Sequence, residues 1–277
     1  MSKAVHPLVE TLIIGGGPAG LATALGLARA RRQVILFDSG KYRNWHVSHM
    51  HNVSTNADGI FEATDAAGET WRGKTLVLAT GVTDNMPDLP GYKECWESCK
   101  IYHCLYCHGY EDSDCASAGI IAAFGLTSDA HLAAQFAGKV VVYTNGSEEL
   151  AQQVQELVKN NPKITTDTRP IEALIKESDA DGEPGIKLGA SDSAPAETVS
   201  HRFFVHAPDA LANVSFAKSL GLELSPNGAE IKTTAPFNAT NVPGCYAVGD
   251  VGSPLKAVSQ AMALGSVAAA GVTTNLF

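Results

Sequence analysis

A run of apolar residues long enough to cross a bilayer as a helix is missing from this chain of 277 residues. Basic residues are also scarce: 20 Lys and Arg stand against 29 Asp and Glu, for a net charge of -9. A nucleic-acid partner is therefore disfavoured, because counterion release needs clustered Lys and Arg. The first ten residues lack the basic segment, apolar stretch and cleavage site of a signal peptide. We expect a cytoplasmic globular protein with no membrane and no nucleic-acid partner.

Cysteine is sparse as well, with six in the chain, and two of them stand in the segment Cys104-Leu105-Tyr106-Cys107-His108. In a reducing compartment, two cysteines separated by two residues are more often catalytic or metal-binding than structural. The letters also match the attachment motif of a c-type haem, but that attachment normally needs an exported chain. Zinc is a stronger alternative, with more cysteines and His103 nearby, although Cys95-x3-Cys99 is a poor second knuckle. We favour a redox dithiol with no metal, and expect the other cysteines to be small packed residues: Cys95, Cys99, Cys115 and Cys245.

Residues 10–40 form the first half of a dinucleotide-binding fold. The apolar run Thr11 to Ile14 suits a buried parallel strand, and a second run, Val34 to Phe37, follows a helical pattern. Glycines between the first strand and the helix let the backbone approach a pyrophosphate, which rests on the helix N-terminus. Asp38, directly after the second strand, can accept hydrogen bonds from a ribose hydroxyl. The sequence therefore predicts a dinucleotide site at a G-x-G-x-x-G turn made of Gly15, Gly16, Gly17, Pro18, Ala19 and Gly20.

Two later strands end in small-residue turns. The strand 76–79 ends in Thr80-Gly81, and the strand 245–248 ends in Gly249-Asp250 ahead of a small-residue helix over 257–273. Together with the glycine turn, these segments resemble the plan of the flavoprotein disulfide reductases. In that plan they flank an FAD: the Asp binds the ribityl chain, and the following helix points its N-terminus at the flavin pyrimidine ring.

The segment after the cysteine pair has a second nucleotide-type layout with damaged binding chemistry. Where a second G-x-G-x-x-A motif would lie, Thr127 takes the place of a glycine. After the strand 140–143, an NADPH domain needs arginines to grip the ribose 2′-phosphate. This chain has Glu148 and Glu149 there, which would repel the phosphate. NADPH binding in the usual mode is not expected.

The order of these motifs resembles the low-molecular-weight thioredoxin reductases, and more closely their fungal dithiol oxidase branch, the gliotoxin oxidase type. The resemblance spans most of the chain, from the glycine turn at 15–20 through Cys-Leu-Tyr-Cys-His-Gly-Tyr-Glu at 104–111 to Pro-Leu-Lys-Ala-Val at 254–258. Thioredoxin reductases have Asp where this chain has His108 and a basic cluster where it has the two glutamates, and the oxidase branch shares both changes. The resemblance implies FAD as the cofactor, with further contacts from Ser39, Arg43, Asn44, His51, Thr80, Gly81, Asp250, Lys256, Ala257 and Val258.

The resemblance also assigns roles to the cysteine segment. Cys107 would face the flavin, and Cys104 would be attacked by a substrate thiolate to form a mixed disulfide, which the second substrate thiol resolves. His108 would take protons from the thiols and, when charged, lower their pKa, while Glu111 either orients the imidazole or is a solvated acid. The implied reaction closes a disulfide in a small epipolythiodioxopiperazine-like secondary metabolite, with O2 as acceptor and H2O2 as product, in a homodimer. The alternatives are an NADPH-dependent thioredoxin-disulfide reductase and a truncated flavoprotein-like chain with little or no activity.

We expect an α/β protein with two Rossmann-like domains of the thioredoxin reductase type. The FAD domain is predicted to be discontinuous, over 1–86 and 209–277, and the inserted redox domain, which resembles an NADPH domain, to cover 87–208. The FAD domain is also shortened, because the family continues after His51 with a helix and a strand that this chain lacks, roughly forty to fifty residues. In the family the missing strand helps to wall the adenine site, so the shortening bears on FAD binding and on dimerisation.

Overall fold

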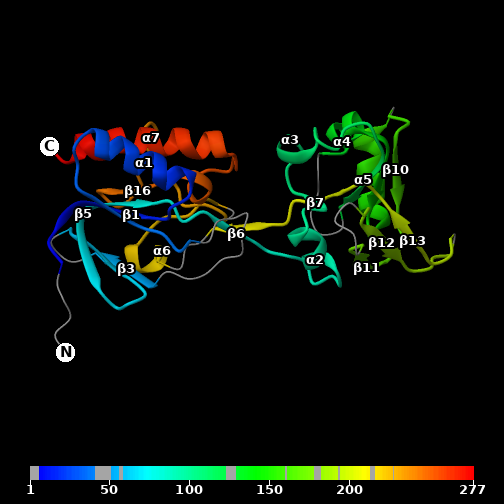
Figure 1. The fold of residues 1–277 in the computed structure, drawn as a ribbon, viewed down its shortest axis with the longest axis horizontal. Coiled ribbons are helices and arrows are strands. Elements are labelled where there is room, and N and C mark those ends of the chain that lie inside the picture. The colour runs from blue at the N-terminus through cyan, green and yellow to red at the C-terminus, as the bar shows by residue number, and fades with distance from the viewer. Residues whose placement is uncertain are drawn as a thin grey trace. The chain divides into compact units, whose positions relative to one another are not determined.

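The chain folds into two compact units (Figure 1). Unit 1 contains Met1–Asp84 and Ala210–Phe277, and unit 2 contains Asn85–Asp209. No helix within the described ranges is long and apolar enough to cross a membrane. The computed structural model describes residues 6–40, 51–55 (backbone only), 59–122, 129–159, 161–177, 182–192, 194–212, 216–226 and 228–277.

Unit 1 is built on a six-stranded sheet with the order β2-β1-β5-β4-β3, in which β16 also pairs with β5. Strands β2, β1, β5 and β16 run parallel, whereas β3, β4 and β5 form an antiparallel meander. The first half of β5 pairs with β4 and its second half with β16, so one long strand serves both parts of the sheet. The strands are β1 (Val9–Ile14), β2 (Val34–Phe37), β3 (His51–Thr55), β4 (Phe61–Thr64), β5 (Thr70–Leu78) and β16 (Cys245–Ala247), with a separate pair, β6 (Val82–Asp84) and β15 (Ala210–Ala212).

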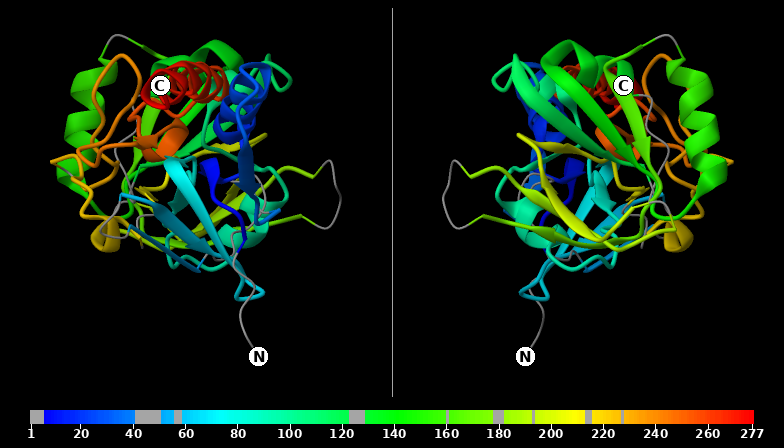
Figure 2. Two further views of the ribbon diagram at one scale, coloured as in Figure 1. Left: turned by 90° about the vertical axis from the view of Figure 1, so that its left-hand side faces the viewer. Right: turned by 90° about the vertical axis from the view of Figure 1, so that its right-hand side faces the viewer.

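Two helices lie side by side on one face of this sheet, α1 (Pro18–Arg29) and α7 (Val258–Asn275) (Figures 1 and 2). Small residues permit the close approach: a Cβ added to Gly26 would lie 2.7 Å from the Cβ of Ala269. The opposite face buries Leu12 and Leu76 against α6 (Ala217–Leu220) and its surroundings. Because both faces are covered, the parallel strands read as continuous apolar runs in the sequence. A single turn of 3-10 helix, η1 (Gly249–Val251), follows β16.

Unit 2 is built on a five-stranded parallel sheet with the order β10-β9-β8-β14-β7. Side chains alternate along a strand, so the apolar end of β9 serves two cores. Val140 and Val142 pack with α4 and α5, whereas Val141 and Tyr143 pack with α2 and a small antiparallel sheet. The elements are α2 (Tyr92–Glu97), β7 (Ile101–Tyr102), α3 (Leu105–His108), β8 (Cys115–Ile121), α4 (Ala130–Phe136), β9 (Ala137–Tyr143), α5 (Glu148–Val158), β10 (Ile164–Asp167), β11 (Ile171–Ile175), β12 (Gly185–Leu188), β13 (Glu197–Ser200) and β14 (Phe204–Val205).

Candidate functional site

The carboxyl ends of four parallel strands meet at one edge of the sheet in unit 1. Ile14 is the partner of both Phe37 and Leu78, and Leu78 is also the partner of Ala247. These residues end β1, β2, β5 and β16, so the loops that follow them leave the sheet together. The register thus gathers predicted FAD contacts from distant parts of the sequence at one edge: Gly15 to Gly20, Asp38, Ser39, Thr80, Gly81 and Asp250.

The glycine turn between β1 and α1 is dictated by close packing. Gly15 has φ +112°, and a Cβ there would lie 2.2 Å from the carbonyl oxygen of Ala79. A Cβ on Gly20 would lie 1.9 Å from the carbonyl oxygen of Gly15, and one on Gly16 would lie 2.4 Å from the carboxyl carbon of Asp38. Larger residues at these positions would therefore push the turn away from its neighbours.

The start of α1 has room and donors for a pyrophosphate. A Cβ added to Gly17, the residue before the helix, would meet no atom within 4 Å. The N-cap residue, Gly17, has no side chain to cap the helix, the first turn holds no acid, and Pro18 occupies the first position. The first N–H groups of a helix attract anions, and the first turn of α1 itself contributes no carboxylate that would repel them. Asp38 lies beside the turn, where it can reach a ribose. The residues present fit an FAD.

Lys256 lies next to the Asp250 turn, but its ammonium group is already engaged. The Nζ atom donates to Glu230 Oε1 at 3.0 Å, to the Asp250 carbonyl at 2.7 Å and to the Ser253 carbonyl at 2.6 Å. An ammonium group has three N–H donors, so these partners use all of them. The side chain can thus act on the cofactor site by fixing the Asp250 turn. The next residue, Ala257, precedes α7, and Val258 begins the helix with an exposed side chain.

Several predicted residues lie outside the part of the chain that can be described. Arg43 and Asn44 lie there, as does Thr127 with the eroded glycine motif over 125–128. For His51 only the backbone, in β3, is described. The assignments of these residues remain predictions.

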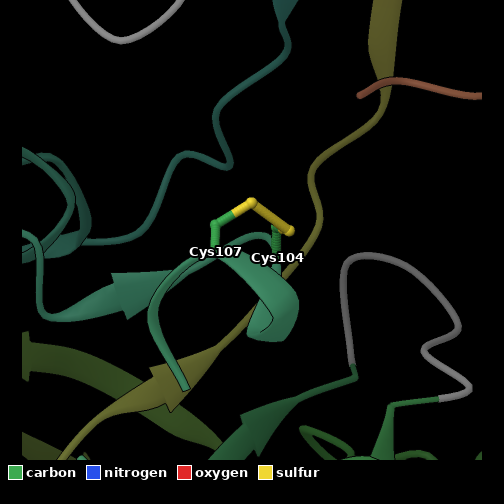
Figure 3. The surroundings of a disulfide bond; sticks show 2 residues. All are labelled: Cys104 and Cys107. Carbon is green, nitrogen blue, oxygen red and sulfur yellow. A yellow bond between two sulfur atoms is a disulfide. The ribbon is translucent and has the colours of Figure 1, made fainter. Parts of the chain in front are cut away.

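Cys104 and Cys107 form a disulfide at the start of α3 in unit 2 (Figure 3). Their Cα atoms are 5.3 Å apart, and the Cys107 N–H donates to the Cys104 carbonyl at 3.1 Å. Leu105 is 2% exposed and anchors the helix in the core, while Cys104 is half-buried and Cys107 exposed. One buried leucine thus holds the short helix so that the second cysteine faces outward.

His108 ends α3 and stacks on a buried tyrosine. Its ring centroid lies 5.3 Å from that of Tyr102, at an interplanar angle of 28°, and Tyr102 stacks in turn on Phe203 at 4.8 Å. The Tyr102 hydroxyl donates to Asp112 Oδ2, and Arg202 Nε donates to Asp112 Oδ1 at 2.6 Å. The Tyr102 and Arg202 contacts hold the pKa of Asp112 low against the opposing effect of burial.

Sequence reasoning missed this network because its members lie far apart and match no motif. Tyr102 precedes the cysteine pair, Asp112 follows it, and Arg202 is 90 positions beyond Asp112. Glu111, the acid considered for orienting the histidine, is exposed. Its neighbour Asp112 is the acid that accepts hydrogen bonds from Tyr102 and Arg202. The one available signal was an acid just after the C-x-x-C-H segment.

The other cysteines differ in their surroundings. Cys95 and Cys245 are buried, and burial raises the pKa of Cys95 to about 11 and that of Cys245 to about 12. Cys115 is half-buried, and its pKa is raised, mainly by burial. Cys99 is exposed, so the prediction of a packed residue was wrong there; it has φ +54°, in the turn that ends α2. Within the described ranges, no cluster of three or more His, Cys, Asp or Glu residues could hold a metal ion.

The carboxyl edge of the parallel sheet in unit 2 is acidic. Ser147 caps α5 by accepting a hydrogen bond from the Leu150 N–H at 3.2 Å, and Glu148 and Glu149 are exposed in the first turn. Just past β10, the Arg169 guanidinium contacts both Asp167 oxygens, Glu197 Oε1 at 2.6 Å and the Pro195 carbonyl at 3.0 Å. Arg169 is thus neutralised by two carboxylates within the unit.

The fold and these sites define a class of protein: a two-unit α/β protein with a dinucleotide-type glycine turn in one unit and a C-x-x-C disulfide in the other. Residues 10–69 match the FAD binding domain family. The chain is 41% identical to thioredoxin reductase aclD of Aspergillus oryzae, over 98% of this chain and 97% of that protein. It is 34% identical to thioredoxin reductase sirT of Leptosphaeria maculans, over 96% of this chain and 93% of that protein.

Solved structures agree with this class. The crystal structure of HlmI aligns with a TM-score of 0.81 at 25% identity, over 99% of this chain and 95% of that chain. The thioredoxin reductase of Streptococcus pyogenes shares the fold, with a TM-score of 0.82 at 21% identity, over 97% of this chain and 98% of that chain. The alignment with the Aspergillus protein spans 313 residues against the 277 present here, in keeping with a shortened chain.

The chain belongs to the thioredoxin reductase-like flavoproteins. It is a flavin-dependent thiol oxidoreductase, and its cofactor is FAD. The predicted family, fold class and cofactor are confirmed.

Proposed function

We propose that the protein is a dithiol oxidase, which closes a disulfide in a small secondary metabolite of the epipolythiodioxopiperazine type and uses O2 as the final acceptor. The observation that carries the proposal is the acidic edge of unit 2. A phosphate on a ribose 2′ oxygen would meet the exposed Glu148 and Glu149 there, and Arg169 is held by Asp167 and Glu197. Electrons from NADPH would therefore lack the usual entry, which leaves a thiol substrate as their source.

The disulfide supplies the thiol chemistry. A substrate thiolate attacks the Cys104 sulfur, which breaks the bond to Cys107 and releases Cys107 as a thiolate. The second substrate thiolate then attacks the substrate sulfur of the mixed disulfide, so the substrate disulfide forms and Cys104 leaves as a thiolate. The two substrate protons pass to His108 and from it to solvent. The Cys104–Cys107 disulfide then has to re-form, with loss of two electrons from the enzyme dithiol; a bound FAD would supply the acceptor for these electrons, and O2 would be the final acceptor, taking up two protons to give one H2O2 per disulfide.

Oxygen uptake by the purified, FAD-loaded protein tests the reaction. We expect dithiothreitol, a simple dithiol probe, to support O2 consumption and H2O2 release in equal amounts. Replacing either Cys104 or Cys107 with Ser should remove the activity, whereas Cys99→Ser, a change at an exposed cysteine outside the pair, should keep it. Turnover that survives both changes within the pair would contradict the mechanism.

An NADPH-dependent thioredoxin-disulfide reductase is the second candidate, favoured by the names of the relatives from Aspergillus and Leptosphaeria. The two candidates differ in their electron source. Under anaerobic conditions, NADPH would bleach the flavin absorbance within seconds if the protein were a reductase. We expect no bleaching with NADPH and rapid bleaching with the dithiol.

A homodimer is proposed as well, because the family resemblance implies one. Analytical ultracentrifugation of the FAD-loaded protein would decide between a mass near twice and a mass near once that of the chain, 29.0 kDa.

A further inference from the structure

The segment that carries the cysteine pair is fixed to the sheet at both of its ends. Before the pair, Tyr102 lies in β7, and β7 pairs with β14 in parallel register. After the pair, Asp112 forms an ion pair with Arg202, two residues ahead of β14. Both ends of the segment are joined at the Asp112 carboxylate, which accepts hydrogen bonds from Tyr102 and Arg202.

This arrangement leaves one face of the Tyr102 ring for His108. Phe203 stacks on Tyr102 with an interplanar angle of 18°, and His108 stacks on it with an angle of 28°. Tyr102 is 8% exposed, so its own position is set by the core. Phe203 is fully buried, whereas His108 is exposed. The histidine therefore has its place set by the tyrosine and not the reverse.

His108 stacks on a ring face that is electron-rich. A cation within about 6 Å of a tyrosine ring centroid is attracted by the ring face. Hydrogen bonding of the Tyr102 hydroxyl to a carboxylate leaves its ring richer in electrons, and burial with Asp112 raises the pKa of Tyr102, so the phenol stays neutral. A protonated imidazole next to Cys107 in the chain would stabilise a thiolate.

We propose that Tyr102 is a positioning residue that, clamped by Asp112 and Arg202, holds His108 in place to activate the thiols of the cysteine pair. The inference rests on the proposed thiol chemistry and deepens it, since it names the residue through which His108 acts. The other titratable groups that act electrostatically on this network are Cys99, Lys100 and Glu183. None of them lies on α3; the His108–Tyr102 stack links the network to the end of the helix, and Leu105 packs in the same core cluster as Tyr102.

Alkylation of the reduced protein tests the clamp without flavin turnover or O2. Iodoacetamide reacts with thiolates, so the rate of labelling at Cys104 and Cys107, followed by peptide mass spectrometry from pH 5 to 9, reports their pKa. We expect His108→Ala to slow labelling at pH 7 by about tenfold. Tyr102→Leu should slow it by about three- to fivefold in the same direction, because the stacking partner is lost.

A double variant separates positioning from general stability. If Tyr102 acts through His108, the Tyr102→Leu/His108→Ala protein should label at the rate of His108→Ala alone. Tyr143→Phe is the matched control, because Tyr143 is another buried tyrosine of unit 2 with a hydroxyl bonded to a histidine, His201. It should leave the pH profile unchanged.

If Tyr102→Leu does not fold, Asp112→Asn provides the same test, since it keeps the side-chain volume and weakens the clamp; labelling at pH 7 should slow about twofold. The inference is overturned by an unchanged profile in His108→Ala, by an unchanged profile in the folded Tyr102 or Asp112 variant, or by additive effects in the double variant. Failure of the proposed function would appear elsewhere, as absence of dithiol-dependent O2 uptake in the wild type.

Discussion

The carboxyl edge of the parallel strands in unit 1 carries glycines and an uncapped helix, whereas the same edge in unit 2 carries a capped helix and carboxylates. In unit 1, Gly17 precedes α1 with open space around it. In unit 2, where α5 follows β9, Ser147 precedes the helix and caps it, and Glu148 and Glu149 follow. In both units, parallel strands have both of their faces covered by apolar side chains of neighbouring elements. The architecture is thus independent of the binding chemistry, which depends on a few residues at the strand ends.

The largest effect is expected where the edge of unit 1 is made to look like that of unit 2. Gly17→Asp places a carboxylate at the helix start, where it can cap α1 and cause no clash. The apoprotein should keep its stability, but the carboxylate would face the pyrophosphate, and FAD affinity should fall by about a hundredfold or more. Fluorescence titration with FAD measures this loss. Ser147→Asp is the control in unit 2 and should leave FAD affinity unchanged; equal FAD binding by Gly17→Asp would show that the turn is not the pyrophosphate site.

Much of this edge could be predicted from the sequence, because local signals and the fold agree there. The strand predicted over Val34 to Phe37 has these bounds in the structure, and the helix predicted over 257–273 is α7. The glycine turn could be predicted because the backbone conformation and the close packing of the turn require glycine. The order of strands follows from the crossover rules that relate parallel strands to the helices between them.

Contacts between distant residues could not be read in the same way. The three N–H donors of Lys256 go to two backbone carbonyls and to Glu230, and a sequence does not show where carbonyl groups lie; its predicted contact with FAD stays a prediction. The Asp112–Arg202 pair joins a loop to the residue before a strand across 90 positions. Such pairs are set by tertiary packing, and no period or motif encodes them.

Each unit also contains a partly buried ion pair, Lys256–Glu230 in unit 1 and Arg169–Asp167 in unit 2. We expect both pairs to stabilise the fold, but only the pair in unit 1 to affect FAD binding. Arg169→Met leaves Asp167 without its partner in unit 2, and we expect the free energy of unfolding to drop by about 3 kcal/mol with no change in FAD affinity. Lys256→Met in unit 1 should cost about 2 kcal/mol and also weaken FAD binding, because the Asp250 turn loses its anchor.

Urea unfolding and FAD titration of both variants measure the two effects. Lys232→Met is the control, since Lys232 pairs with Glu223 on the surface and should contribute less than about 0.5 kcal/mol. If Arg169→Met weakened FAD binding as much as Lys256→Met does, the separation of roles between the two units would be wrong.

Acid should destabilise unit 2 through a buried histidine. His201 accepts or donates hydrogen bonds with Tyr143 and Ser117, and burial lowers its pKa to about 4. The unfolded imidazole titrates near 6.5, so between pH 6.5 and 4 the unfolded state binds more protons. The free energy of unfolding therefore falls as the pH drops through this window, by about 2 kcal/mol at pH 5.

Hydrogen exchange at pH 7 and pH 5 locates this loss, which should be larger for peptides of β8 and β9 than for those of β1 and β5. His201→Asn should flatten the dependence, whereas His131→Asn, at an exposed position on α4, should leave it as it is. Equal loss of protection in both units at pH 5 would mean that another group controls the acid response.

The smallest effect is expected from the reverse exchange, in which unit 2 is given a basic edge. Glu148→Arg/Glu149→Arg removes two carboxylates from the first turn of α5 and supplies two guanidinium groups. Adenosine 2′,5′-bisphosphate is a suitable probe, because it carries the 2′-phosphate of NADPH without its redox chemistry. We expect its affinity, measured by calorimetry relative to AMP, to rise by about tenfold over the wild type, since charge reversal acts on the phosphate while the rest of the edge is unchanged.

Glu156→Arg/Glu177→Arg is the control for this exchange, because it makes the same change in net charge at exposed residues away from that turn. A similar gain in affinity in the control would assign the effect to net charge rather than to the strand-end turn. A gain confined to the first pair of changes would show that these two carboxylates, and not the fold of unit 2, keep a 2′-phosphate away from this turn.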